Sequence, residues 1–163
     1  MKKSLFLAAV MVVLGVTTAV AQPRAIGVNL GYGIDFSYQH NLGEKNMIDL
    51  SVNVPGFVGI GATCTYDWIN PFNTQIPWSY KGEWNWAMGV GGGAGYYWPR
   101  AGYAGVVGHI GVAYDFWFPL ELSFDWRPNI GVGFGDFGDT ESNCWFNAWG
   151  LYTGITLGVR YKF

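Results

Sequence analysis

The sequence predicts an all-β protein, a single closed antiparallel barrel of eight strands that crosses a membrane. Apolar residues recur at every second position over most of the chain, which is typical of strands with lipid on one face and a polar lumen on the other. Aromatic residues make up 18% of the 163 residues and charged residues only 12%. No stretch after residue 21 reaches the roughly 18 apolar residues of a spanning helix.

Residues 1–21 have the features of a cleaved secretory signal peptide. Lys2 and Lys3 precede an apolar stretch of about twelve residues, too short to span a membrane, and Ala19-Val20-Ala21 forms a small-residue cleavage site. Residues 22–163 are then the barrel, which is one domain's worth of chain. They keep seven Lys and Arg against eleven acids, and this negative balance disfavours a nucleic-acid partner.

The alternation predicts three strands in the first half of the barrel, at Ile26–Gln39, Met47–Val54 and Val58–Trp68. In each of them the even-numbered residues are apolar and most of the odd-numbered residues are small or polar. A helix would scatter the same residues around its axis, so the period of two indicates strands.

The fourth predicted strand, Glu83–Tyr97, carries aromatic residues at both ends of an apolar run. The ten residue steps from Trp86 to Tyr96 span roughly 33 Å, or near 25 Å of membrane height at a tilt of about 40°. This spacing predicts two aromatic girdles, one at each surface of the membrane. The predicted girdle residues, including two at the end of the chain, are Trp84, Trp86, Tyr96, Trp98, Tyr161 and Phe163.

Four further strands complete the predicted count of eight, which is the even number that a closed single-chain barrel requires. They are Ala104–Phe116, Leu120–Arg127, a short glycine-rich Ile130–Phe134, and Asn147–Phe163, where the alternation runs to the last residue.

The predicted connections alternate between tight turns and longer loops. The tight ones contain proline (Pro55-Gly56, Pro99–Gly102 and Pro128) and are expected at the periplasmic end, and the longer ones (Ile69–Gly82 and Gly135–Phe146) at the outer end. The short connection Trp117–Pro119 is the exception to this asymmetry.

Most of residues 22–163 resembles the small eight-stranded outer-membrane barrel proteins of Gram-negative bacteria, in the broad OmpA/OmpX-like group. The segments Gly31–His40, Pro119–Pro128 and Leu157–Phe163 carry the resemblance, and the last is similar to the C-terminal signal read by the outer-membrane assembly machinery. The resemblance implies a location in the outer membrane, with lipid, lipopolysaccharide and the barrel assembly machinery as partners. It implies no particular activity.

The inward-facing positions hold charges, and a charge in a narrow lumen needs a partner or water. We therefore expect lumenal ion pairs, for example between Asp125 and Arg127 or Arg160. The cations are expected toward the periplasmic end and most of the acids toward the outer end, so a mouth that favours cations is the alternative. The predicted lumen polar network consists of Asp35, Asp49, His109, Asp125, Arg127 and Arg160.

Many of the 25 glycines fall on the inward positions. They either permit the strong coiling of a tight barrel or leave a cavity that holds a ligand or conducts a solute. The two cysteines do not make a disulfide framework, because Cys64 falls on the apolar face of a strand and Cys144 in a predicted loop.

No residue pattern indicates a catalytic, metal or cofactor site. His109 is predicted to face the lumen in mid-strand with no nucleophile motif beside it, and Asp136, Asp139 and Glu141 lack the spacing of a calcium loop. We therefore expect a non-enzymatic, porin-like outer-membrane protein with a structural or surface role in the envelope. A narrow passive conduit for a small, cationic solute is the alternative, and a lipid A-modifying or proteolytic barrel enzyme is a distant third.

Overall fold

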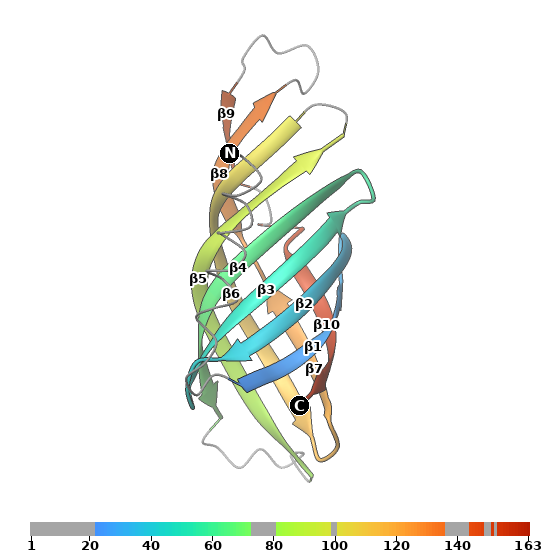
Figure 1. Cartoon of the computed structure of the whole chain (residues 1–163), viewed down its shortest axis with the longest axis vertical. Coiled ribbons are helices and arrows are strands. Elements are labelled where there is room, and N and C mark those ends of the chain that lie inside the picture. Colours follow the sequence, from blue (N-terminus) through green and yellow to red (C-terminus); the bar gives the residue numbers. More distant parts are fainter. Residues whose placement is uncertain (1–21, 73–80, 99–100, 136–143, 149–150, 152) are drawn as a thin grey trace, which may run out of the picture.

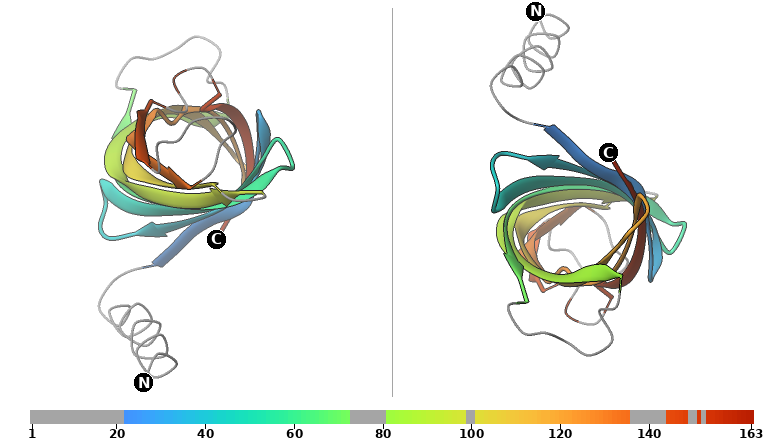
Figure 2. Two further views of the ribbon diagram at one scale, coloured as in Figure 1. Left: turned by 90° about the horizontal axis from the view of Figure 1, so that it is seen from above. Right: turned by 90° about the horizontal axis from the view of Figure 1, so that it is seen from below.

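The structure is a computed structural model that describes residues 22–72, 81–98, 101–135, 144–148, 151 and 153–163. Within these residues the regular elements are all strands, and they form one antiparallel sheet that closes into a barrel (Figures 1 and 2). No helix in this part of the chain is long and apolar enough to cross a membrane. The predicted signal peptide, residues 1–21, lies outside the described residues.

Ten strands fill eight positions around the barrel. The strands are β1 (Gln22–Leu30), β2 (Gly33–Asn41), β3 (Asn46–Pro55), β4 (Gly59–Pro71), β5 (Gly82–Tyr97), β6 (Ala101–Phe116), β7 (Leu120–Trp126), β8 (Asn129–Gly135), β9 (Cys144–Asn147) and β10 (Ile155–Lys162). The ring runs from β1 to β7 and returns through β10 to β1, while β8 and β9 extend it beyond β7 and β10. The closed eight-stranded barrel predicted from the sequence is thus present.

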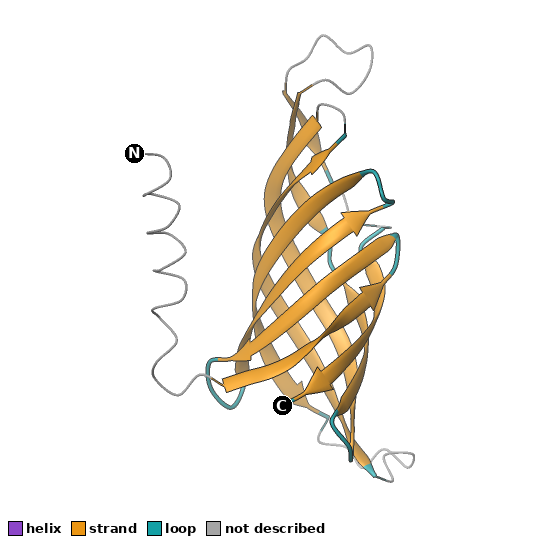
Figure 3. Ribbon diagram, turned by 45° about the vertical axis from the view of Figure 1, so that its right-hand side comes forward, coloured by secondary structure: helices purple, strands orange, loops and turns teal. Residues whose placement is uncertain are grey.

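The strand register gives the barrel a large stagger. From Val28 the pairing leads through β2, β3, β4 and β5 to Ala104 of β6, whereas the route through β10 and β7 leads to Tyr114, ten residues further along β6. A stagger of this size requires strands tilted by about 40° to the barrel axis, and Figure 3 shows them steeply inclined. Eight strands at this tilt enclose a lumen narrow enough for side chains to fill.

The barrel has its apolar side chains outside and its polar side chains inside. In β10, Leu157 and Val159 are exposed, while Thr156 before them and Arg160 after them are buried. Among the described residues, the buried set contains 14 polar or charged residues and only five hydrophobic ones, which is the reverse of a water-soluble domain.

The first predicted strand, Ile26–Gln39, is wrong in extent: it is the hairpin of β1 and β2, with a turn at Gly31 and Tyr32. Leu30 pairs with Ile34 across this turn, so three residues lie between two side chains that face the same way. The alternation therefore continues in phase through the turn and cannot reveal it. The two glycines around Tyr32 were the only local signal.

The predicted strands Leu120–Arg127 and Ile130–Phe134 do not occupy two separate positions in the sheet. β7 and β8 follow one another in the same direction along β6, and the amide of Gly108 in β6 donates to the carbonyl oxygen of Pro128 at 2.8 Å. Pro128 interrupts one long strand because it lacks an amide hydrogen, and it does not turn the chain. The hairpin of β1 and β2 was predicted as one strand, and the interrupted strand formed by β7 and β8 was predicted as two. The two errors cancel, so the predicted count of eight was right.

Because of these two errors, the connections between the two mispredicted segments were assigned to the wrong end of the barrel. β1, β3 and β5 end at the upper end of the barrel in Figure 1, and β2, β4 and β6 end at the lower end, where Phe163 also lies. Pro55-Gly56 and Trp98 therefore lie at the end away from Lys162, whereas the predicted arrangement put these connections and Lys162 at the same end. The short Trp117–Pro119 connection joins β6 to β7 at the lower end, where the strand ends that flank the longer connection Ile69–Gly82 also lie, so the predicted separation of tight and long connections is wrong.

The last predicted strand, Asn147–Phe163, is two strands. β10 begins only at Ile155, and Asn147 ends β9, which pairs with β8 at the upper end (Figure 1). The backbone of Cys144 also lies in β9, so its predicted place in a loop is wrong. Cys64 is an exposed free thiol.

Closure depends on β10, because it pairs with β1 on one side and β7 on the other. Val159→Pro removes an amide hydrogen in the middle of this strand, so we expect the refolded protein to lose the compact, heat-sensitive gel mobility of a closed barrel and most of its β-sheet circular dichroism. The control is Glu44→Pro, in the turn between β2 and β3. Normal folding of Val159→Pro would contradict the role assigned to β10.

Candidate functional site

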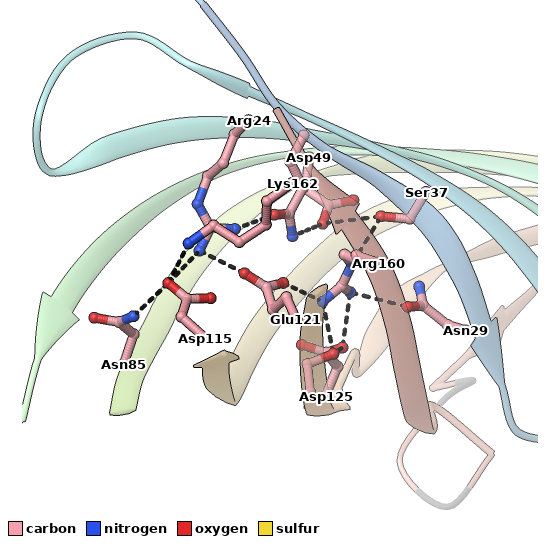
Figure 4. Close-up of polar contacts among 12 residues, drawn as sticks. Arg24, Asn29, Ser37, Asp49, Asn85, Asp115, Glu121, Asp125, Arg160 and Lys162 are labelled. Carbon is pink, nitrogen blue, oxygen red and sulfur yellow. Dashed lines mark hydrogen bonds and ion pairs between the residues drawn. The ribbon is translucent and has the colours of Figure 1, made fainter. Parts of the chain in front are cut away.

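The lower half of the lumen is filled by hydrogen-bonded polar side chains, with Arg160 of β10 at their centre (Figure 4). Its guanidinium Nη1 contacts Glu121 at 3.0 Å and the hydroxyl of Ser123 at 2.6 Å. Its Nη2 donates to Asn29 and to Asp125, both at 2.9 Å, and its Nε donates to the hydroxyl of Ser37 at 3.3 Å. One side chain thus links β1, β2 and β7 to β10.

A second group of ion pairs closes the lower end. Arg24 of β1 pairs with Glu121 at 2.6 Å and donates to Gln39. Lys162 of β10 pairs with Asp115 of β6 at 2.6 Å, and the side-chain amide of Asn85 donates to the same carboxylate at 3.0 Å. The two ion pairs join strands that are not hydrogen-bonded neighbours, since Arg24 of β1 reaches β7 and Lys162 of β10 reaches β6 (Figure 4).

His109 is held between two carboxylates. Its Nδ1 lies 2.9 Å from Asp67 and its Nε2 lies 3.1 Å from Asp125, and all three side chains are buried. A carboxylate only accepts hydrogen bonds, so both contacts are hydrogen bonds when the imidazole carries a proton on each nitrogen. Thr65 donates to the other oxygen of Asp67 at 2.9 Å.

Asp49 of β3 joins these groups to the middle of the lumen. It accepts hydrogen bonds from Gln39 and from the Nη2 of Arg127, both at 3.0 Å. We call the whole set the lumen network: Arg24, Asn29, Ser37, Gln39, Asp49, Thr65, Asp67, Asn85, His109, Asp115, Glu121, Ser123, Asp125, Arg127, Arg160 and Lys162. Its five carboxylates face four Arg and Lys side chains and one histidine, so its charges balance when the imidazole is protonated.

The structure brings five of the six residues of the predicted polar network together. Asp49 pairs with Arg127, and Asp125 joins His109 to Arg160. Asp35 lines a cavity described below, which Arg127 also lines. Of the two ion pairs named from the sequence, Asp125–Arg160 forms, whereas the partner of Arg127 is Asp49.

The predicted separation of cations from acids along the axis is wrong. Arg24 and Lys162 pair with Glu121 and Asp115 at one end of the barrel. The reason is the missed turn after Leu30, which reversed the end assigned to several inward acids. The alternation did place these acids inside, but only the correct connections put them beside the cations.

The inward glycines make room for the network. A Cβ atom added at Gly158 would lie 2.3 Å from the hydroxyl oxygen of Ser123, and one at Gly89 would lie 1.8 Å from a carboxylate oxygen of Asp67. At Gly27 the added atom would lie 2.7 Å from the Cγ of Arg160. At Gly158 and Gly89 the side chains of the network occupy the space of an added Cβ, whereas at Gly27 the nearest atom is the backbone oxygen of Val159, at 2.2 Å.

The upper half of the lumen contains a cavity of about 100 Å³, which we call the upper cavity. It reaches the turns after β1 and β3, since Tyr32 and Pro55 line it, and the lumen network lies below it. Its polar lining consists of Tyr32, Asp35, Ser51, Asn53, Thr63, Tyr97, Tyr103, Arg127, Asn129, Thr153 and Thr156. A second, much smaller cavity of about 20 Å³ lies within the network.

The predicted girdle residues occupy both ends of the outer surface. Trp84 and Trp86 lie near the lower end of β5, Tyr96 and Trp98 at its upper end, and Tyr161 and Phe163 at the lower end of β10. The ring of Trp84 packs on Tyr114 of β6 at 5.0 Å between centroids, and Tyr161 packs on Phe163 at 5.5 Å.

The acidic loop residues Asp136, Asp139 and Glu141 lie outside the described residues.

Removing Arg160 should leave the buried carboxylates of Glu121 and Asp125 without their shared partner. We expect Arg160→Met to lower the free energy of unfolding in urea by about 3–5 kcal/mol, since breaking a buried ion pair leaves an uncompensated charge. Lys162→Met is the matched control, because this side chain is partly exposed and should cost far less. Equal effects of the two substitutions would argue against a central role for Arg160.

The glycine interpretation is tested by a pair of alanine substitutions. Gly158→Ala should cost about 1–3 kcal/mol of unfolding free energy through overpacking against Ser123 and Asn29. Gly92→Ala, on the outer face of β5, should be close to neutral, because the nearest atom to the added Cβ is 3.7 Å away. If both variants unfolded at the same urea concentration, glycine would be serving the coiling of the barrel and not the space for the network.

No family model matches the chain, and no curated protein or solved structure is significantly similar to it.

Proposed function

We propose that this chain is an integral outer-membrane β-barrel protein without enzymatic activity, with a structural or surface role in the cell envelope. The observation that carries the proposal is the reversed polarity of the barrel. Large apolar side chains such as Leu157, Phe36 and Val106 are about 60% exposed, while Arg160 and Glu121 are almost completely buried. Lipid is the solvent that favours such a surface, and closure of the sheet pairs the backbone groups within it.

The aromatic residues at the two ends of β5 and β10 support the same proposal. Trp and Tyr side chains favour the interface between lipid and water, because their rings are apolar and their polar atoms can reach water. Residues 1–21 would direct export, and the terminal strand ending at Phe163 would be read by the barrel assembly machinery. Lipid and lipopolysaccharide would then surround the barrel in the outer membrane of a Gram-negative cell.

Two of the described side chains that could perform catalysis, His109 and Ser123, are occupied by structural contacts. Both nitrogens of His109 contact carboxylates, and the hydroxyl of Ser123 contacts Asp125 at 2.5 Å and Arg160 at 2.6 Å, not the histidine. A hydrolase needs a nucleophile that its base can reach and that meets the substrate. The lumen network instead ties the strands together, which favours a structural role.

A membrane environment predicts an unusual response to an exposed substitution. Leu157→Arg, near the middle of the outer surface, should lower the stability of the barrel in lipid vesicles by about 2–4 kcal/mol, whereas an exposed Leu→Arg in a water-soluble protein is usually neutral. Leu42→Arg, in the exposed turn between β2 and β3, is the control and should have little effect. Equal urea midpoints for the two variants would argue against lipid around Leu157.

The lumen network also distinguishes this proposal from the alternative of a narrow conduit. Wild-type protein should be electrically silent in planar bilayers, because ion pairs such as Arg24–Glu121 and Lys162–Asp115 cross its lower end. Reproducible, cation-selective single-channel steps in the wild-type protein would favour the conduit. The protein must first show barrel mobility on unheated gels, so that silence is not caused by misfolding.

A further inference from the structure

We infer that the upper cavity binds a small, neutral, polyhydroxylated ligand, in the size range from a triol to a single hexose. The site lies above the lumen network and is independent of the structural role proposed for the barrel. Four properties of its lining support the inference: buried polar groups without partners, balanced charge, aromatic surfaces and a closed floor.

The lining contains buried hydroxyl groups whose hydrogen-bonding capacity is unused. Ser51 and Thr156 are only 2% and 7% exposed, and neither hydroxyl has a hydrogen-bond partner among the described residues. The same is true of the hydroxyl of Thr63 and of the Nε and Nη1 atoms of Arg127. Leaving buried polar groups unpaired costs free energy, so this cluster favours a ligand that carries several donors and acceptors.

The two charged residues of the lining have opposite signs. Asp35 accepts hydrogen bonds and Arg127 donates them, and both line the same cavity. An anion would face the carboxylate of Asp35, and a cation would face the guanidinium of Arg127. A neutral ligand with hydroxyl groups can donate to the first and accept from the second.

Aromatic rings form one wall of the upper cavity. Tyr97 and Tyr103 lie 5.5 Å apart between ring centroids, at an angle of 35°. The backbone opposite is glycine: a Cβ atom at Gly95 would lie 2.4 Å from the ring of Tyr103, and one at Gly61 2.3 Å from its hydroxyl oxygen. The glycines thus let the Tyr103 ring lie flat in the lumen, where it offers an apolar surface to the C–H groups of a sugar ring.

The size and the floor of the cavity limit the ligand. A single water molecule needs about 10–15 Å³ measured in this way, so about 100 Å³ accommodates several waters or one small polyol. The Asp49–Arg127 ion pair at 3.0 Å lies at its floor. A ligand entering from the upper end would bind there without passing through the barrel.

Saturation-transfer NMR on the refolded mature protein in detergent tests the inference. The probes are glycerol, D-glucose and D-mannose as neutral polyols, acetate as an anion, tetramethylammonium as a cation and glycine as a zwitterion. We expect saturable transfer to at least one polyol and none to the three charged probes. Ser51→Phe should abolish it by filling the cavity, and Leu50→Phe, the adjacent outward residue on β3, should leave it unchanged.

A second, milder variant keeps the test valid if Ser51→Phe does not fold. Thr63→Val keeps the shape of the side chain but removes its hydroxyl, and should weaken polyol binding by about three- to tenfold, the loss of one hydrogen bond. Preferential saturable binding of acetate, tetramethylammonium or glycine would overturn the ligand class. Absence of saturable transfer from every probe, or transfer that persists in Ser51→Phe, would overturn the site. Neither result bears on the membrane location, which the arginine substitutions test separately.

Discussion

The interior of this barrel depends on the pairing of buried charges around Arg160. Eight strands with a stagger of ten residues leave a lumen too narrow for a full hydration shell around each charge, so each must find a protein partner. The Arg160 guanidinium meets this constraint with five hydrogen bonds to three other strands, β1, β2 and β7. The network is therefore a cross-link as well as a filling, and it holds the walls at the spacing that its hydrogen bonds require.

Glycine and charge are two parts of the same arrangement. Long polar side chains can lie across a narrow lumen only where the facing backbone carries no side chain, as at Gly89 beside Asp67 and Gly158 beside Ser123. Elsewhere the same residue type leaves room for the Tyr103 ring. At Gly33, Gly91 and Gly131, by contrast, the atom nearest to an added Cβ is a backbone oxygen of the neighbouring strand, so there glycine permits a close approach of the strands. Gly92, which faces outward with open space around it, shows that the strands also tolerate glycine where nothing needs the room.

The alternation of hydropathy was sufficient for the fold class but not for the connections. It correctly separated outward residues such as Leu157 from inward residues such as Arg160, because a period of two is a direct property of a strand. It could not locate the turn at Gly31 and Tyr32, since a three-residue connection preserves the phase, nor could it distinguish the strand interruption at Pro128 from a turn. The partners of Arg24 and Asp115 depend on which ends of the strands meet, and that information lies in the connections. The upper cavity, likewise, depends on side chains from several strands at one level.

The two halves of the lumen suit different tasks, and the Asp49–Arg127 pair joins them. Below it the charges are matched and nearly every hydrogen bond of Arg160 is made, so this half resists both hydration and opening. Above it, Arg127 keeps two guanidinium nitrogens without partners among the described residues, beside hydroxyl groups in the same condition. One arginine therefore contributes to the seal through Nη2 and to the proposed binding surface through its other nitrogens. A barrel built in this way can hold a small polar ligand at one end while remaining closed to its passage, which separates binding from transport.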